Sequence, residues 1–163
     1  MTPAAPPPVI TSASPTAAVQ GKTVTITGLN LTGATAVRFN GVRAKYSVLS
    51  DTKISTTVPN GARTGPLFVS APGGTAQSRF TFSVKPTLKS FSPGSGSVGA
   101  TVVIKGMALA DTSEVMFNGV DAAFTVNSYV QVTVTVPAGA TTGRITVVTT
   151  GGRAKSKTAF VVA

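Results

Sequence analysis

The sequence predicts an all-β protein made of two consecutive β-sandwiches, and three observations carry this prediction. The chain aligns with itself at an offset of 78 residues without a gap, with about 30 of roughly 77 positions identical. Apolar and polar residues alternate along short segments, which is the period of strands buried on one face. Turn-forming residues separate these segments at the roughly 8–12-residue spacing that is typical of sandwiches and barrels.

The first repeat is predicted to contain seven strands, and the second repeat contains the same elements 78 residues later. No stretch has a convincing helical period, and seven short strands per unit are typical of an immunoglobulin-like sandwich. The strands are expected near residues 9–13, 23–28, 36–40, 42–49, 53–58, 66–71 and 76–84. The side chains expected to point inward are Val24 and Ile26 in the second strand, Leu67 and Val69 in the sixth, and Phe80, Phe82 and Val84 in the last.

The segment FNGV occurs twice, at residues 39–42 and 117–120. Asn-Gly between apolar flanks favours a two-residue hairpin, because a type I′ turn needs a positive φ at both central residues. The repeated segment therefore predicts the same hairpin in each unit, and it marks architecture rather than an active site.

The predicted domains are residues 8–84 and 85–163, preceded by a Pro/Ala-rich arm at residues 1–7. The junction Val84-Lys85-Pro86 contains no Gly/Ser spacer, which favours a rod-like arrangement over two freely tethered domains. The arm has nothing to bury, so we expect it to be disordered unless it serves as a tether or oligomer contact through Pro3, Pro6 and Pro7. Its first residues show no basic start followed by an apolar stretch, so no signal peptide is predicted there.

The motifs of both repeats resemble those of the IPT/TIG family of immunoglobulin-like domains. The motifs are the opening Pro-x-Ile/Leu-x-Ser-x-Ser-Pro, Gly-x-Thr-Val-x-Ile-x-Gly, Val-x-Phe-Asn-Gly, Val-Pro-x-Gly-Ala-x-Thr-Gly and the closing Gly-Gly-x-Ala-x-Ser. The resemblance implies a sandwich that spaces, displays or binds, in bacterial surface proteins, receptor ectodomains, some transcription factors and phage particles. It implies no reaction, so function still has to be argued from a site.

The composition leaves little room for catalysis. The chain has no His and no Cys, which excludes a Ser–His–acid triad, zinc ligated by His or Cys, and disulfides. Its carboxylates are Asp51, Asp111, Glu114 and Asp121. Only the last three are close in sequence, and we favour a solvated rim there over a calcium site. We therefore predict no enzyme, no catalytic residue, no metal and no cofactor.

The excess of basic residues is the remaining signal, since 14 Lys and Arg face 4 acidic residues and the net charge is +10. Strand alternation places four of them outward on strands that share one sheet in this fold. These candidate partner-binding residues are Arg38, Arg43, Lys45 and Arg79. Such a face either docks onto an acidic partner or an anionic glycan surface, or is a solvated face that protects edge strands.

Aromatic residues offer little for sugar binding, because the chain has no Trp and only two tyrosines. Tyr46 aligns with Phe124 and is predicted to be a core residue with its hydroxyl at the rim. Tyr129 replaces Asp51 in a connecting turn, where it is either an exposed contact or has no role.

Three functions remain open, all without catalysis. The first is a structural or display protein on a virion surface, such as a capsid decoration or tail protein, with homo-oligomers formed through the arm. The second is a bacterial cell-surface or secreted spacer and adhesion module that binds glycan. The third is a basic nucleic-acid-binding domain, which is disfavoured because the chain lacks a recognition helix and interleaved basic and aromatic residues. The first two place the protein outside the cell, with no membrane insertion.

Overall fold

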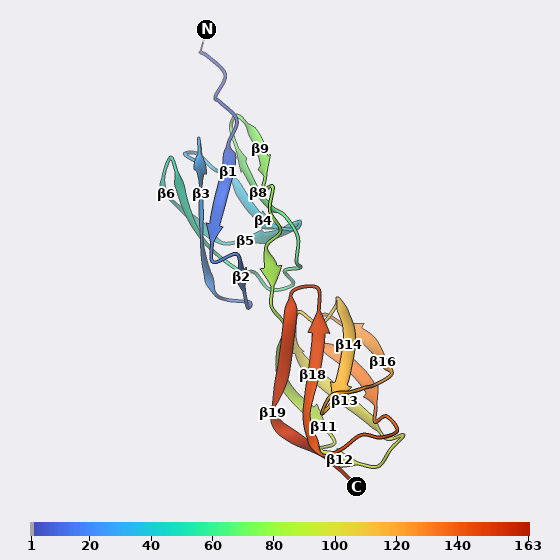
Figure 1. Cartoon of the computed structure of the whole chain (residues 1–163). Coiled ribbons are helices and arrows are strands. Elements are labelled where there is room, and N and C mark those ends of the chain that lie inside the picture. Colours follow the sequence, from blue (N-terminus) through green and yellow to red (C-terminus); the bar gives the residue numbers. More distant parts are fainter. Residues whose placement is uncertain (1) are drawn as a thin grey trace. The chain divides into compact units, whose positions relative to one another are not determined.

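The computed structural model describes residues 2–163, and the elements in this range are all strands (Figure 1). The chain divides into two compact units, of which unit 1 ends at Val84 and unit 2 begins at Lys85. Within residues 2–163, no helix is long and apolar enough to cross a membrane.

Unit 1 contains two four-stranded antiparallel sheets, with the orders β1-β3-β7-β6 and β5-β4-β8-β9. A short parallel pair, β2 with β10, adds to them. The strands are β1 (Val9–Ser14), β2 (Ala17–Ala18), β3 (Thr23–Leu29), β4 (Ala36–Phe39), β5 (Val42–Ala44), β6 (Tyr46–Ser50), β7 (Lys53–Thr57), β8 (Leu67–Ala71), β9 (Gly74–Gln77) and β10 (Ser83–Val84).

Unit 2 repeats the arrangement, with one sheet of order β11-β13-β17-β16 and a five-stranded sheet of order β12-β19-β18-β14-β15. The strands are β11 (Thr87–Ser92), β12 (Ser95–Gly96), β13 (Thr101–Met107), β14 (Thr112–Phe117), β15 (Val120–Asp121), β16 (Phe124–Ser128), β17 (Gln131–Thr135), β18 (Gly143–Thr149) and β19 (Gly152–Val162). The predicted all-β fold of two immunoglobulin-like sandwiches is thus confirmed.

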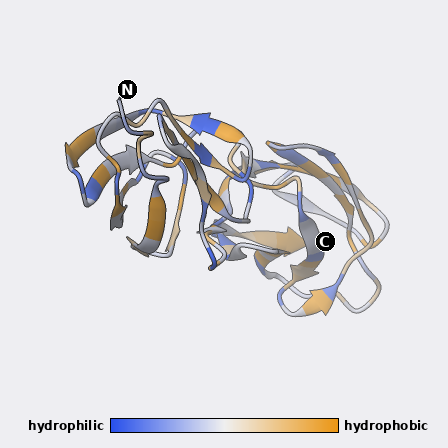
Figure 2. Ribbon diagram, turned by 90° about the horizontal axis from the view of Figure 1, so that it is seen from above, coloured by the Kyte–Doolittle hydropathy of each residue, from blue (hydrophilic) through white to orange (hydrophobic). Residues whose placement is uncertain are grey.

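Each sandwich has its own core, built from the inward residues of its two sheets. Hydrophobic and hydrophilic residues alternate along several strands (Figure 2), as expected for sheets with one buried face. In unit 1, Phe39 and Phe82 pack edge to face with their ring centroids 5.1 Å apart. Phe117 and Phe160 form the same pair in unit 2 at 5.0 Å. The predicted inward residues of β3 and β8 are all fully buried.

Both predicted hairpins are present. Asn40 and Gly41 have φ values of 44° and 93°, and Asn118 and Gly119 have φ values of 46° and 88°. Both central positions of each turn are thus in the left-handed region that a type I′ turn requires. The hairpins join β4 to β5 and β14 to β15, and they bring the outward side chains of these strands together.

Two predicted strands are wrong in their extent. The strand expected at residues 42–49 is broken at Lys45, because the Lys45 carbonyl accepts hydrogen bonds from Thr56 Oγ1 (2.7 Å) and Thr57 N (3.3 Å) of the other sheet. The chain therefore changes sheets at this point, with β5 in one and β6 in the other. The strand expected at residues 76–84 is divided into β9 and β10 in unit 1, whereas β19 is continuous in unit 2.

The last residues of the N-terminal arm lie against unit 1. Asn30 Nδ2 donates a hydrogen bond to the Pro7 carbonyl at 2.9 Å. The Pro6 carbonyl approaches Gly73 so closely that a Cβ atom at that position would collide with it. The tether role of Pro3, Pro6 and Pro7 stays a prediction.

Candidate functional site

The outer face of sheet β5-β4-β8-β9 carries a continuous row of four side chains. The register pairs Arg43 with Arg38, Arg38 with Phe68, and Phe68 with Gln77. Directly opposed residues of antiparallel strands project from the same face of a sheet. This face is the outer one, because the chain neighbours of Arg38 and Phe68 on β4 and β8 are fully buried. We call the row Arg43, Arg38, Phe68 and Gln77 the Phe68 face.

The Phe68 face combines an aromatic ring with charged and polar groups. Phe68 and Arg38 are half-buried, whereas Arg43 and Gln77 are exposed. Arg43 Nη2 also donates to the Thr35 carbonyl at 3.4 Å, which ties the side chain to the end of β4. The face can therefore offer a flat apolar surface flanked by planar hydrogen-bond donors.

The same row in unit 2 has different chemistry. Its register places Asp121 beside Met116, Met116 beside Thr146, and Thr146 beside Lys155. There is no aromatic ring in this row, and an acid stands where unit 1 has Arg43. The two units thus present matched positions with unlike side chains.

The four predicted basic residues are not all on strands. Arg38 and Arg43 face each other on β4 and β5, in keeping with the predicted basic face. Lys45 lies at the crossing between β5 and β6, and Arg79 follows the end of β9 in a bend. Both of these side chains are exposed. Their role as partner contacts stays a prediction.

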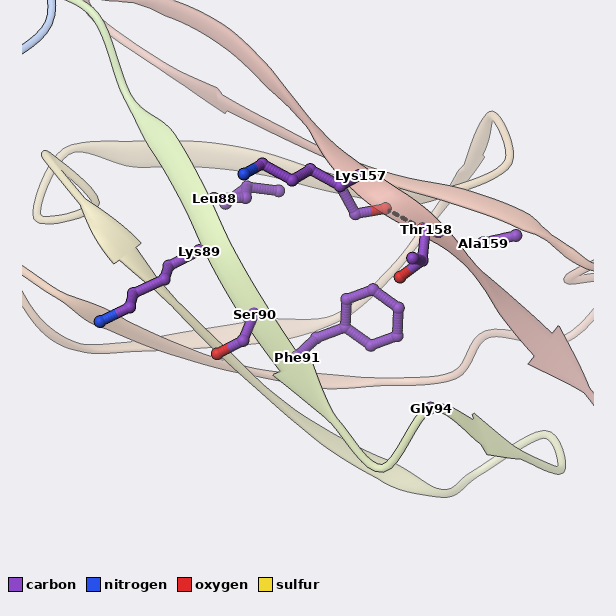
Figure 3. A pocket seen from close by; sticks show the side chains of 9 residues that line it. Leu88, Lys89, Ser90, Phe91, Gly94, Lys157, Thr158 and Ala159 are labelled. Carbon is purple, nitrogen blue, oxygen red and sulfur yellow. Dashed lines mark hydrogen bonds between the residues drawn. The ribbon is translucent and has the colours of Figure 1, made fainter.

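Unit 2 contains a cleft of about 320 Å³ between β11 and β19, the β11–β19 cleft (Figure 3). It lies where β11, the edge strand of one sheet, meets the part of β19 that β12 does not pair with, and it is open to solvent. Its lining residues are Leu88, Lys89, Ser90, Phe91, Gly94, Ser156, Lys157, Thr158 and Ala159. Figure 3 shows the side chains of Lys89 and Lys157 extending toward the same side of the view, away from the Phe91 ring.

A bulge in β19 shapes one wall of this cleft. The register between β18 and β19 shifts between Arg144 and Thr146, which leaves residues 156–158 outside regular pairing. The buried Ser156 Oγ accepts a hydrogen bond from Ile145 N at 3.0 Å and donates one to the Thr158 carbonyl at 2.6 Å. This side chain therefore fixes the segment from which Lys157 and Thr158 project.

The acidic residues form no site in the structure. No group of three or more metal-binding side chains occurs among residues 2–163. Asp51 receives hydrogen bonds from the Thr32 amide at 3.3 Å and the Asn30 amide at 3.2 Å. The hydrogen bonds from the Thr32 side chain and amide, followed by that from Asn30, lower the pKa of Asp51 from its usual 3.8. Asp51 thus stabilises a loop.

The two tyrosines are both half-buried. The Tyr46 hydroxyl donates to the Ala34 carbonyl at 2.7 Å, but the side chain is not fully buried as the predicted core residue would be. Tyr129 lies in the connection between β16 and β17, as expected, and contributes to neither surface described above.

The sequence analysis missed Phe68 and Phe91 as surface aromatics. The signal for Phe68 was available, because a residue between the inward Leu67 and Val69 must point outward. Phe91 carried no such signal, since its partial exposure depends on how far apart β11 and β19 lie.

Comparisons with known proteins now extend this picture. A family model described as the IPT/TIG domain matches residues 8–84 and 86–162. No curated protein matches the chain.

Among solved structures, the chain is similar to a surface glycan-binding protein from Prevotella bryantii. The identity is 18% and the TM-score 0.60, over 94% of this chain and 42% of that one. It also resembles SGBP-B from a complex xyloglucan utilization locus in Bacteroides uniformis, with 23% identity and a TM-score of 0.44 over 96% of this chain and 50% of that one.

The extracellular region of plexin A4 is a third such structure, with 22% identity and a TM-score of 0.46 over 96% of this chain and 18% of that one. The chain spans half or less of the length of each of these structures. The likeness to the Prevotella bryantii protein shows a shared fold.

Proposed function

The chain belongs to the IPT/TIG domain family over both of its repeats, and from this premise we propose that it is a non-catalytic, glycan-binding module of a bacterial cell-surface protein. The observation that carries the proposal is the Phe68 face of unit 1. The glycan-binding alternative of the sequence analysis is thereby preferred to the virion protein.

The chemistry of the Phe68 face suits a sugar chain. A pyranose ring has an apolar face of C–H groups that packs on an aromatic ring, and its edge carries hydroxyls that need hydrogen-bond partners. Phe68 supplies the ring, while Arg38 and Gln77 stand on either side of it with planar donors. The face lies on the outer side of a sheet, so it can accept an extended chain without a deep pocket.

One of the comparisons supports the proposal. A protein that shares this fold is described as a surface glycan-binding protein from Prevotella bryantii. Cell-surface placement is accordingly part of the proposal.

Binding of the 163-residue chain to a panel of neutral and acidic polysaccharides tests the proposal, with affinity measured by calorimetry. Phe68→Ala should weaken binding at least about tenfold, because buried aromatic contacts dominate the energy of such sites. Thr146→Ala is the matched control, since it occupies the same position in unit 2 and should leave affinity unchanged. Equal affinities of wild type and Phe68→Ala, or no binding to any polysaccharide, would overturn the proposal.

Salt dependence separates this function from nonspecific nucleic-acid binding. A protein that only neutralises phosphates loses affinity steeply as salt rises. We expect the affinity for DNA to fall steeply between low and physiological salt, while the affinity for a neutral polysaccharide changes little.

A further inference from the structure

We infer that the β11–β19 cleft of unit 2 binds a carboxylated sugar residue, that is, a uronic acid within a glycan chain. This inference rests on the proposed glycan-binding function and adds a second binding site for the glycan, one that is positively charged. It is independent of the Phe68 face, because its residues belong to unit 2 and to different strands.

The cleft exposes apolar surface that unit 1 buries at the same positions. Leu88 and Phe91 are half-buried. Their counterparts in unit 1, Ile10 and Ala13, are only 7% and 8% exposed. The volume of about 320 Å³ is at the lower end of pockets that bind small molecules.

Phe91 gives the cleft a firm apolar floor. Its ring lies 6.2 Å from that of Phe160, tilted by 55°, and Phe160 is fully buried in the core. The ring is therefore anchored on one side while its remaining surface lines the cleft. A sugar ring needs such a surface for its apolar face.

The rim of the cleft is basic and contains no acid. Lys89 from β11 and Lys157 from β19 stand on opposite walls, and both are exposed. Figure 3 shows the two side chains extending toward the same side of the view. Charge complementarity between these ammonium groups and a carboxylate selects an acidic ligand over a neutral one.

The polar groups between floor and rim match the remaining parts of a uronic acid. Ser90 and Thr158 bring hydroxyls to the cleft, and a hydroxyl both donates and accepts hydrogen bonds as sugar hydroxyls require. Inorganic phosphate would make no use of the apolar floor, whereas a neutral sugar would leave both lysines without a counter-charge. A carboxylated pyranose uses the apolar floor, the hydroxyl groups and the two lysines.

The wall that carries Lys157 is held in place before any ligand arrives. The hydrogen bonds of Ser156 to Ile145 N and the Thr158 carbonyl fix the bulge on both sides of Lys157. A preformed wall reduces the entropy that binding must overcome.

The test is calorimetric titration of the 163-residue chain with an α-1,4-linked galacturonic acid trimer, beside the equivalent neutral galactose trimer. We expect the acidic trimer to bind at least about tenfold more tightly than the neutral one at physiological salt. A trimer of aspartic acid serves as a second anion without a sugar ring, and we expect it to bind as weakly as the neutral trimer.

Two variants and one control locate the binding. The double variant Lys89→Gln/Lys157→Gln should reduce affinity for the acidic trimer at least about tenfold. Thr158→Phe should do the same without changing the charge, because it places in the cleft the residue that unit 1 has at this position, Phe80. Lys155→Gln is the control, since Lys155 lies two residues away on β19 but does not line the cleft.

The outcomes separate this inference from the proposed function. Loss of affinity in Lys155→Gln equal to that in the double variant would show nonspecific attraction and overturn the inference, as would equal binding of the aspartic acid trimer. If polysaccharide binding that depends on Phe68 persists while the acidic trimer does not bind, the cleft inference fails and the proposed function stands. If no glycan binds at all, both fail.

Discussion

The two units share an inner frame, that is, their strand arrangement and buried core residues, and they differ at the outward positions of their sheets. Each core contains one edge-to-face phenylalanine pair, Phe39 with Phe82 and Phe117 with Phe160. Each unit also contains one buried serine whose hydroxyl accepts a hydrogen bond from a backbone amide. Ser78 accepts from Leu67 N on β8, and Ser156 accepts from Ile145 N on β18. In contrast, the outer row reads Arg, Arg, Phe, Gln in unit 1 and Asp, Met, Thr, Lys in unit 2.

One sandwich fold with similar buried residues thus carries two kinds of outer surface in this chain. Outward positions are free to change because their side chains do not pack between the sheets. The binding chemistry of each unit therefore has to be determined separately, although the units have the same fold.

The largest effect should come from the core pairs. Phe82→Ala and Phe160→Ala should each destabilise their own unit by about 3–5 kcal/mol, because they leave a cavity beside a buried ring. The loss in unit 2 should be greater by about 0.5–1.5 kcal/mol, because Phe160 also contacts Phe91. Hydrogen exchange in urea, followed separately for amides of residues 8–84 and 86–162, measures the free energy of unfolding of each unit. An equal loss of protection in both units from one substitution would contradict independent cores.

The buried serines should have nearly equal effects in the two units. Ser78→Ala leaves Leu67 N without its 2.9 Å hydrogen bond, and Ser156→Ala does the same to Ile145 N at 3.0 Å. An unsatisfied buried amide costs about 1–3 kcal/mol. The same exchange measurement applies, with the exposed Ser90→Ala as control. A loss confined to one unit would show that the two serines are not equivalent.

The sequence predicts the inner frame well because its signals are local. The Asn-Gly hairpins and the inward residues Val24 and Ile26 follow from turn chemistry and alternation within a few residues. The break at Lys45 does not, because alternation continues through it. Its cause is a pair of hydrogen bonds from β7, whose position only the folded chain defines.

The candidate surfaces were predictable only in part. Alternation shows that Arg38 and Phe68 each point outward, but their pairing requires the register between β4 and β8. The β11–β19 cleft depends on the spacing of two strands from different sheets, which no local pattern records. Arg38 and Arg43 were found from the sequence by strand alternation, and the hairpin at Asn40 places them opposite each other.

Removal of the arm should weaken unit 1 alone. A chain that lacks residues 1–7 loses the hydrogen bond from Asn30 Nδ2 to the Pro7 carbonyl, at a cost of about 0.5–1.5 kcal/mol. Unit 2 should keep its stability, which makes it the internal control in the exchange experiment. Light scattering on the same samples tests the predicted oligomer contact of Pro3, Pro6 and Pro7. That prediction requires the full chain to form a larger oligomer than the shortened chain, and a monomer in both cases would contradict it.

The smallest effect should be a difference between the units in acid, caused by Asp51. The hydrogen bonds from Thr32 and Asn30 hold the pKa of Asp51 below its usual 3.8 in the folded chain. A carboxyl with a lowered folded pKa stabilises the fold above its unfolded pKa, and this contribution is lost as pH falls through the folded pKa.

Unit 1 should therefore lose stability below about pH 4, and the Asp51→Asn variant should not show this loss. Unit 2 has Tyr129 at this position, so Asp51→Asn should leave its acid profile unchanged. Because Asp51 is exposed, solvent screens the effect, and exchange protection in the loop at residues 30–32 is the most sensitive measurement of it. An identical acid profile for wild type and Asp51→Asn would show that these hydrogen bonds do not distinguish the charged from the neutral carboxyl.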